Sequence, residues 1–131
     1  MVHISSSHKK QLYKVEITSP SGNTLIADEP LENGGQNLGF SPHELLAAAL
    51  AACTSATVKM YANRKEWALD EIKTQISLEF DKETQKTSII RNIELAGDLD
   101  EVQRAKLLYI ANVCPVHKIL SNPIAIDTKL I

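Results

Sequence analysis

Two cysteines are the side chains of this sequence best suited to redox or nucleophilic chemistry. Cys53 stands in an alanine-rich, helix-forming run, where a solitary thiol is most often a small buried hydrophobic group. Cys114 directly precedes Pro115 at a predicted helix start, where unpaired backbone N–H groups and the helix dipole lower the pKa of a thiol. Cys114 could equally be an ordinary core or interface cysteine. The spacing alone leaves open whether the two thiols meet.

Metal binding is an alternative use of the same residues. His117 follows Cys114 by three residues, so this segment could supply two zinc ligands, with Cys53 and His43 as candidates for the others. Zinc sites usually contain a second closely spaced pair of ligands, and this sequence has none. We therefore expect no metal, and we expect His117 to face solvent.

A carboxylate, Glu44, lies at the start of the predicted helix that carries Cys53. Ser41, Pro42 and Glu44 match the N-cap, the first helical residue and the reciprocal glutamate of a capping box. This carboxylate thus has a structural explanation, and His43 beside it is typical of an exposed first turn.

Length and composition restrict the class of protein. The chain has 131 residues with 44% hydrophobic residues, which predicts one domain over residues 1–131 with a sizeable core. A net charge of −2 leaves no basic excess for nucleic acid or anionic lipid. The longest uncharged run, residues 45–58, is shorter than the ~20 residues of a membrane span, so we expect none. The polar N-terminus lacks the pattern of a secretory signal, which favours a cytoplasmic protein with reduced thiols.

The hydrophobic pattern predicts an α+β fold of antiparallel hairpins and helices. Arg91 falls among apolar neighbours on the inward face of its strand and needs a partner there. Asp98 is the predicted N-cap of the second helix. The expected elements, in order, are strands at 11–17 and 24–27, a glycine-rich loop at 31–40, a helix from 41 to about 63, strands at 70–81 and 87–96, a helix at 99–113, a short helix from 115 to about 122, and a last strand over 124–130.

The predicted helix over 41–63 is apolar nearly all round, which indicates a central, buried position. One sheet covers only part of such a helix. A second copy of the chain is the natural cover for the rest, so we expect a homodimer with a hydrophobic interface.

Two segments of the chain resemble the OsmC/Ohr family, the osmotically inducible and organic hydroperoxide resistance proteins. The first is Ser41–Cys53, SPHELLAAALAAC, and the second is Val113–Leu120, VCPVHKIL. The order of predicted elements agrees with this family over nearly the whole chain. The resemblance implies an OsmC-like fold, with antiparallel sheets packed around a long central helix. It also implies an intertwined homodimer with two active sites at the subunit interface.

The resemblance further implies a thiol-dependent peroxidase without cofactor or metal. Cys53 would attack the hydroperoxide and become a sulfenic acid, and Cys114 would resolve it as a Cys53–Cys114 disulfide. An external dithiol, such as a dihydrolipoyl protein, would then reduce the disulfide by exchange. The organic hydroperoxide would thereby be reduced to an alcohol.

The sequence departs from the peroxidases of this family at the charges that serve the reactive thiol. The carboxylate that follows the proline is replaced by His43, and Glu44, the candidate catalytic carboxylate, stands one position later. The activating arginine of the family comes from the N-terminal third, whereas the first arginine here is Arg64. Lys14 and Arg91 are the candidate substitutes. These departures favour an alternative function, a redox-sensing or ligand-binding dimer with little peroxidase activity.

Overall fold

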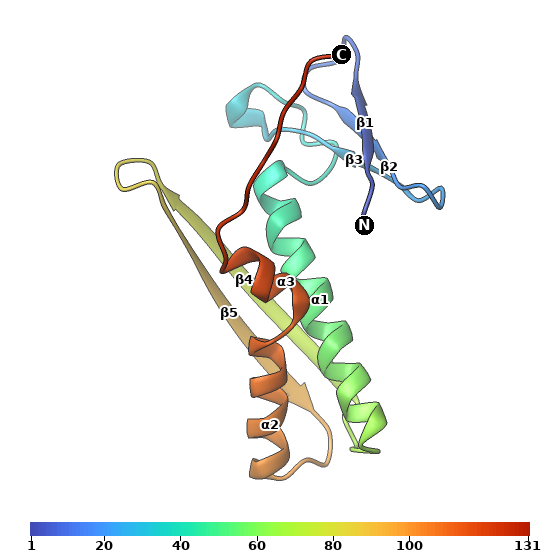
Figure 1. Cartoon of the computed structure of the whole chain (residues 1–131), viewed down its shortest axis with the longest axis vertical. Helices are drawn as coiled ribbons and strands as arrows, with labels where there is room; N and C mark the ends of the chain where they lie inside the picture. Colours follow the sequence, from blue (N-terminus) through green and yellow to red (C-terminus); the bar gives the residue numbers. More distant parts are fainter. The chain divides into compact units, whose positions relative to one another are not determined.

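The computed structural model describes all residues, 1–131, and the chain divides into two compact units, Met1–Leu46 and Ala47–Ile131. Three short strands form the first unit, and a hairpin with three helices forms the second (Figure 1). The predicted mixture of helices and antiparallel strands is confirmed. That residues 1–131 form a single domain stays a prediction.

The first unit is an antiparallel sheet with the strand order β1-β2-β3. Its strands are β1 (Ser5–His8), β2 (Val15–Thr18) and β3 (Thr24–Ala27). The strand predicted from Gln11 starts only at Val15, because the chain turns there and the Lys14 N–H donates to the Gln11 carbonyl at 3.0 Å. Strand β1 is not predicted from the sequence, because its four residues are polar and exposed and it is paired through its backbone with β2.

A buried carboxylate organises the loop that follows β3. Asp28 is 2% exposed. Burial by itself raises the pKa of this carboxyl, but bonds from four backbone N–H groups outweigh it and hold the pKa below its usual value. The predicted glycine-rich loop also approaches other backbone closely, since a Cβ at Gly39 would collide with the Ile26 carbonyl. The donors to Asp28 are the N–H groups of Tyr13 (3.1 Å), Glu29 (2.8 Å), Gln36 (3.2 Å) and Leu38 (3.1 Å).

Helix α1 (Pro42–Arg64) starts at the predicted capping box. The Ser41 N–H donates to Glu44 Oε1 at 2.9 Å, and the Glu44 N–H donates to Ser41 Oγ at 3.2 Å. The helix is not buried all round within the chain, since only one stripe is covered, at a spacing of four residues. This stripe contains Leu50, Thr54, Val58 and Ala62.

By length and composition, α1 could cross a membrane. Its most apolar 18-residue window has a mean hydropathy of 1.4, and 22% of that window is buried within the chain. The expectation drawn from the short uncharged run is therefore too strict, because a span tolerates one or two charged side chains. The core helix of a soluble protein passes the same test, so the property does not indicate a membrane protein. The low buried share shows that a single chain leaves most of the apolar surface of this helix exposed.

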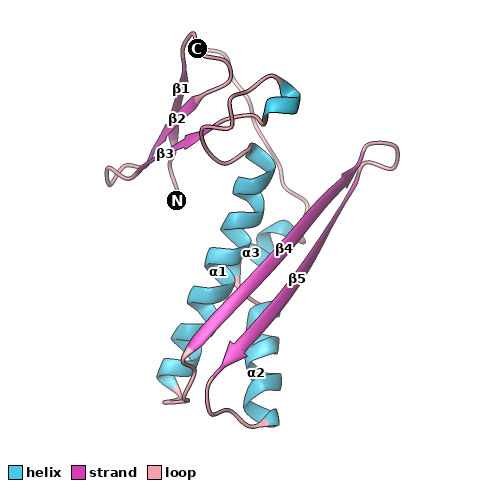
Figure 2. Cartoon of the chain, turned by 180° about the vertical axis from the view of Figure 1, so that it is seen from behind, coloured by secondary structure: helices cyan, strands magenta, loops and turns pink.

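The second unit is built on an antiparallel hairpin of β4 (Glu71–Asp81) and β5 (Lys86–Ala96). Helices α2 (Glu101–Asn112) and α3 (Pro115–Leu120) lie with α1 on one face of this hairpin (Figures 1 and 2). Alternate residues of β5 turn toward the helices, and Arg91 is among these half-buried positions, as predicted. The core contains Val58, Ala62, Leu69, Leu99, Leu107 and Ala111.

Two sequence-based expectations about the second unit are wrong. The N-cap of α2 is Asp100, not Asp98, because the Asp100 carboxylate accepts the Gln103 N–H at 2.7 Å and the Gln103 side chain returns the bond to the Asp100 N–H. The strand predicted over 124–130 is absent, since residues 123–131 have no regular structure. Its apolar residues find no strand to pair with in this chain and are exposed.

The corrected helix start gives a test with a matched control. Asp100→Ala removes the side-chain cap and should lower the free energy of unfolding by about 0.5–2 kcal/mol. Asp98→Ala makes the same change of charge two residues earlier and should change the stability much less. Urea denaturation followed by circular dichroism measures both values. Equal effects of the two variants would contradict Asp100 as the N-cap.

Candidate functional site

The two cysteines come together in the second unit. Cys53 lies in the middle of α1, where it is half-buried, and Cys114 is the fully buried N-cap residue of α3. Both thiols are free, and the Cys114 side chain lies near enough to Cys53 to lower the pKa of its thiol. Proximity of two thiols is what formation of a disulfide between them requires.

The start of α3 places backbone donors on both sulfurs. Pro115 occupies the first helical position, where it costs nothing because its missing N–H would have no helical partner. The next N–H, that of Val116, donates to the Cys53 sulfur. The N–H of His117 donates to Cys114 Sγ at 3.4 Å. The Cys-Pro-Val-His segment therefore serves both thiols through its backbone.

Arg91 of β5 supplies the positive charge beside Cys53. Its Nη1 donates to Thr54 Oγ1 at 3.0 Å, and its Nη2 donates to Asn112 Oδ1 at 3.0 Å and to His117 Nδ1 at 3.0 Å. Every partner is a neutral side chain, and Arg91 takes part in none of the ion pairs of the chain. The charge is thus fixed in position without being neutralised.

The surroundings of Cys53 favour the thiolate. Burial by itself raises the pKa of this thiol. Hydrogen bonds from Val116 N–H, Thr57 and the Cys114 thiol, together with the charge of Arg91, outweigh burial and bring the pKa below its usual value. The Thr57 hydroxyl lies 3.7 Å from the sulfur. The Cys53 thiol therefore ionises to the reactive thiolate more readily than an ordinary cysteine.

A cavity of about 420 Å³ opens beside Arg91 within the second unit. His117 lines it and is half-buried, so the expectation that this histidine faces solvent is wrong. The ring turns inward because Nδ1 is an acceptor for the guanidinium. The cavity has apolar and polar walls, formed by Leu50, Thr87, Ile89, Arg91, Asn112, His117, Leu120 and Ser121.

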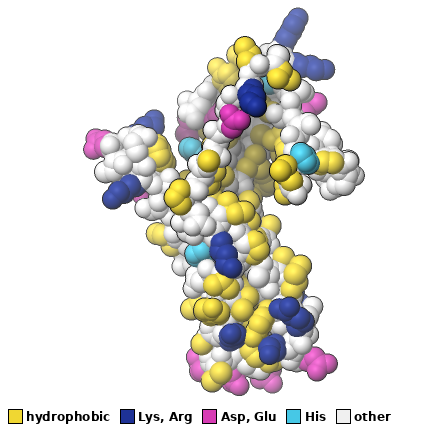
Figure 3. Space-filling view, viewed as in Figure 1, with side chains coloured by type: hydrophobic (Ala, Val, Ile, Leu, Met, Phe, Trp, Pro, Cys, Tyr) yellow, Lys and Arg dark blue, Asp and Glu magenta, His cyan; other side chains and the backbone are white.

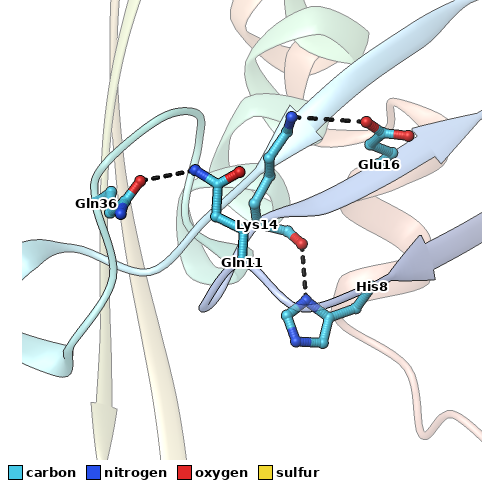
Figure 4. Close-up of polar contacts among 5 residues, drawn as sticks. All are labelled: His8, Gln11, Lys14, Glu16 and Gln36. Atoms are coloured by element: carbon cyan, nitrogen blue, oxygen red, sulfur yellow. Dashed lines mark hydrogen bonds and ion pairs between the residues drawn. The ribbon is translucent and has the colours of Figure 1, made fainter.

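The other candidate residues lie in the first unit. The Glu44 carboxylate is exposed and bonded in the capping box, and His43 is exposed beside it. Lys14, the other candidate cation, pairs with Glu16 at 3.6 Å, next to the bonds that join His8 to the Lys14 carbonyl and Gln11 to Gln36 (Figure 4).

The zinc alternative finds no support, since no group of three or more His, Cys, Asp or Glu side chains is close enough to hold a metal ion.

Sequence reasoning missed two residues of the site, Thr54 and Asn112. In the sequence both are ordinary helix residues, and their role depends on the bonds that Arg91 of β5 donates to them. The one usable signal was that an inward-facing arginine must find acceptors on the helices that cover its strand.

The family model for OsmC-like proteins matches residues 34–129, and the chain belongs to this family. The resemblance found in the sequence is thereby confirmed. A search of curated protein sequences finds no significant relative.

Solved structures of OsmC and organic hydroperoxide resistance proteins share the fold. An OsmC-like protein from Mycoplasma pneumoniae has a TM-score of 0.78 at 18% identity, covering 92% of this chain and 86% of its own. The organic hydroperoxide resistance protein OhrB of Bacillus subtilis has a TM-score of 0.62 at 24% identity, covering 92% and 90%. An organic hydroperoxide resistance protein OsmC from Legionella pneumophila has a TM-score of 0.69 at 21% identity, covering 92% and 89%.

The contribution of Arg91 to the Cys53 thiolate can be measured directly. Arg91→Met removes the charge, so the pKa of Cys53 should rise and alkylation by iodoacetamide at pH 7 should slow about threefold to tenfold. Mass spectrometry assigns the alkylated residue at each pH.

Arg64→Met is the matched control, because Arg64 ends α1 and stacks over Tyr61 at 5.7 Å, away from the thiols. An unchanged pH profile in Arg91→Met would rule out Arg91 as the activating cation.

Proposed function

We propose that this protein is a thiol-dependent peroxidase that reduces organic hydroperoxides to alcohols. The observation that carries the proposal is the Cys53 sulfur, which has a charged guanidinium nearby and receives hydrogen bonds from the Cys114 thiol and a backbone N–H. The names of the Bacillus and Legionella proteins, which share the fold, agree with this activity.

In the first step, the Cys53 thiolate attacks the terminal oxygen of the hydroperoxide. An S–O bond forms as the O–O bond breaks, and the departing alkoxide takes up a proton to leave as the alcohol. The sulfur loses two electrons and becomes a sulfenic acid. Arg91 favours the thiolate that starts this step, because its positive charge lies near the sulfur and is not paired with a carboxylate of the same chain.

In the second step, Cys114 resolves the sulfenic acid. Its sulfur attacks the oxidised Cys53 sulfur, and the hydroxyl group leaves as water with the proton that Cys114 gives up. The product is a Cys53–Cys114 disulfide. An external dithiol, a dihydrolipoyl protein or another of its class, reduces it by thiol–disulfide exchange and returns both thiols.

We propose that the working form is a homodimer. Apolar side chains of α1 are exposed in the single chain, Met60 at 66% for example, and Figure 3 shows other hydrophobic side chains on the surface of the molecule. Ile124, Ile126 and Leu130 are likewise exposed on a segment without a strand partner. A second copy would bury both sets, which is the composition expected of an obligate interface.

Glu44 is proposed as a further catalytic carboxylate, acting on the cation at the thiol in the dimer. This role rests on the family resemblance, because the carboxylate is bonded to the Ser41 N–H within its own chain. The compartment is proposed to be the cytoplasm, where the thiols of the resting protein would stay reduced.

A redox sensor or ligand-binding dimer is the second candidate. It is favoured by the absence of a carboxylate on Arg91, since the peroxidases of the family use an arginine and a glutamate together. The cavity of about 420 Å³ would then hold the ligand. Slow, unselective oxidation of Cys53 by peroxides would favour this candidate.

The decisive experiment is rapid mixing of the reduced protein with cumene hydroperoxide and with hydrogen peroxide. Cys53→Ser should abolish consumption of the organic peroxide. Cys114→Ser should retain one turnover, because attack by Cys53 needs no second thiol, and should accumulate sulfinic acid faster than the parent protein. Trp67 fluorescence and mass spectrometry follow the reaction.

The same assay tests Glu44. Glu44→Gln preserves the capping box, since glutamine also serves at this position, so a large loss of rate without a loss of stability would support the carboxylate. Full activity in Glu44→Gln would remove Glu44 from the mechanism, and oxidation of Cys53→Ser at the parent rate would overturn the peroxidase.

The dimer is tested by sedimentation velocity. We expect twice the mass of one chain, and we expect Met60→Glu to produce monomers because a charge would enter an apolar interface. Met60→Leu keeps the apolar contact and should remain dimeric. A parent protein that sediments as a monomer at micromolar concentration would contradict the proposal.

A further inference from the structure

Arg91 is held entirely by uncharged acceptors, one from each helix of the second unit. Thr54 belongs to α1, Asn112 to α2 and His117 to α3, and each accepts at 3.0 Å. The ion pairs of the chain lie elsewhere, at Lys14–Glu16, Lys73–Glu71 and Lys129–Asp127. The direction of the guanidinium is therefore set by hydrogen bonds alone.

The bond to His117 fixes the protonation pattern of its ring. An arginine only donates hydrogen bonds, so Nδ1 of His117 must accept, and the ring proton of a neutral imidazole then stands on Nε2. The backbone of the same residue donates to Cys114 Sγ at 3.4 Å. His117 thus contacts the activating cation with its ring and the resolving thiol with its main chain.

The other two acceptors differ from His117 in how they are fixed. The Thr54 hydroxyl is fully buried and donates to the Leu50 carbonyl one turn earlier, so its lone pair remains for Arg91. Asn112 is the last residue of α2 and is exposed. Thr54 therefore anchors Nη1, while Nη2 depends on an exposed amide and on the half-buried imidazole.

We propose that His117 is a positioning residue whose Nδ1 lone pair holds the Arg91 guanidinium at Cys53 and so sets the reactivity of that thiol. The role deepens the proposed peroxidase function and rests on it only for the peroxide step. Without Nδ1, one of the three bonds is lost and the guanidinium can turn into the adjoining cavity, which Arg91 and His117 both line. The charge then lies farther from the sulfur on average.

The test uses isosteres of the two ring nitrogens in a Cys114→Ser background, which leaves Cys53 as the single thiol. In His117→Asn the side-chain oxygen takes the place of Nδ1, whereas in His117→Gln it takes the place of Nε2. His117→Leu has no acceptor. The rate of iodoacetamide alkylation is measured across pH 5–10 for each, where ~8.5 is the midpoint of an ordinary cysteine.

We expect His117→Leu and His117→Gln to alkylate about twofold to threefold more slowly at pH 7, a smaller effect than that of Arg91→Met because the charge is displaced and not removed, with the midpoint moved to higher pH. His117→Asn should restore most of the parent rate. His43→Leu, a histidine outside the site, is the matched control and should leave the profile unchanged. If His117→Leu fails to fold, the difference in alkylation rate between His117→Asn and His117→Gln tests the proposal by itself.

The proposal is overturned if the profile of His117→Leu matches the parent, or if Asn and Gln behave alike. The peroxide assay on the same variants, in the background that retains Cys114, separates this result from the proposed function. A shifted alkylation profile in a protein that does not consume peroxide leaves the positioning role intact and refutes the peroxidase.

Discussion

A half-buried guanidinium requires acceptors wherever its N–H groups point, and in the second unit this requirement joins β5 to all three helices. Arg91 leaves β5 and reaches α1, α2 and α3 in turn. The His117 acceptor is in place only when α3 packs against the other helices, and the same packing brings Cys114 and the Val116 N–H to Cys53. The third bond of the arginine and the thiol pair therefore depend on the same helix. Because none of the acceptors is charged, the positive potential remains available to a thiolate.

The local parts of this arrangement were readable from the sequence. The capping box of Ser41 and Glu44, the two-residue period that turns Arg91 inward and the Cys-Pro helix start each depend on residues a few positions apart. The segments Ser41–Cys53 and Val113–Leu120 then indicated the family, and the resemblance implied the pairing of thiols that spacing alone left open. Local sequence patterns do not predict the contacts between residues that are far apart in the chain.

The features that the sequence did not predict depend on contacts between distant segments or on the local geometry of the backbone. Strand β1 has no pattern of its own and exists through its backbone bonds to β2. His117 was expected in solvent because nothing near it in the sequence needs an acceptor, whereas Arg91, 26 residues earlier, does. Residues 124–130 carry the alternation of a strand, yet a strand needs an edge to pair with. Two aspartates stood near the start of α2, and only the geometry of the turn chose Asp100.

The loop after β3 shows a different kind of dependence on sequence. Asp28 is surrounded by main-chain donors, so the side chains at positions 13, 29, 36 and 38 contribute nothing to those bonds. Related chains could therefore differ at these four positions and keep the bonds to Asp28, with proline excluded because it has no N–H. Position 28 has no such latitude, since asparagine offers one acceptor oxygen where the carboxylate offers two. Among related chains with this loop, the residues that donate through their backbone should therefore vary in type, while the aspartate at position 28 should not.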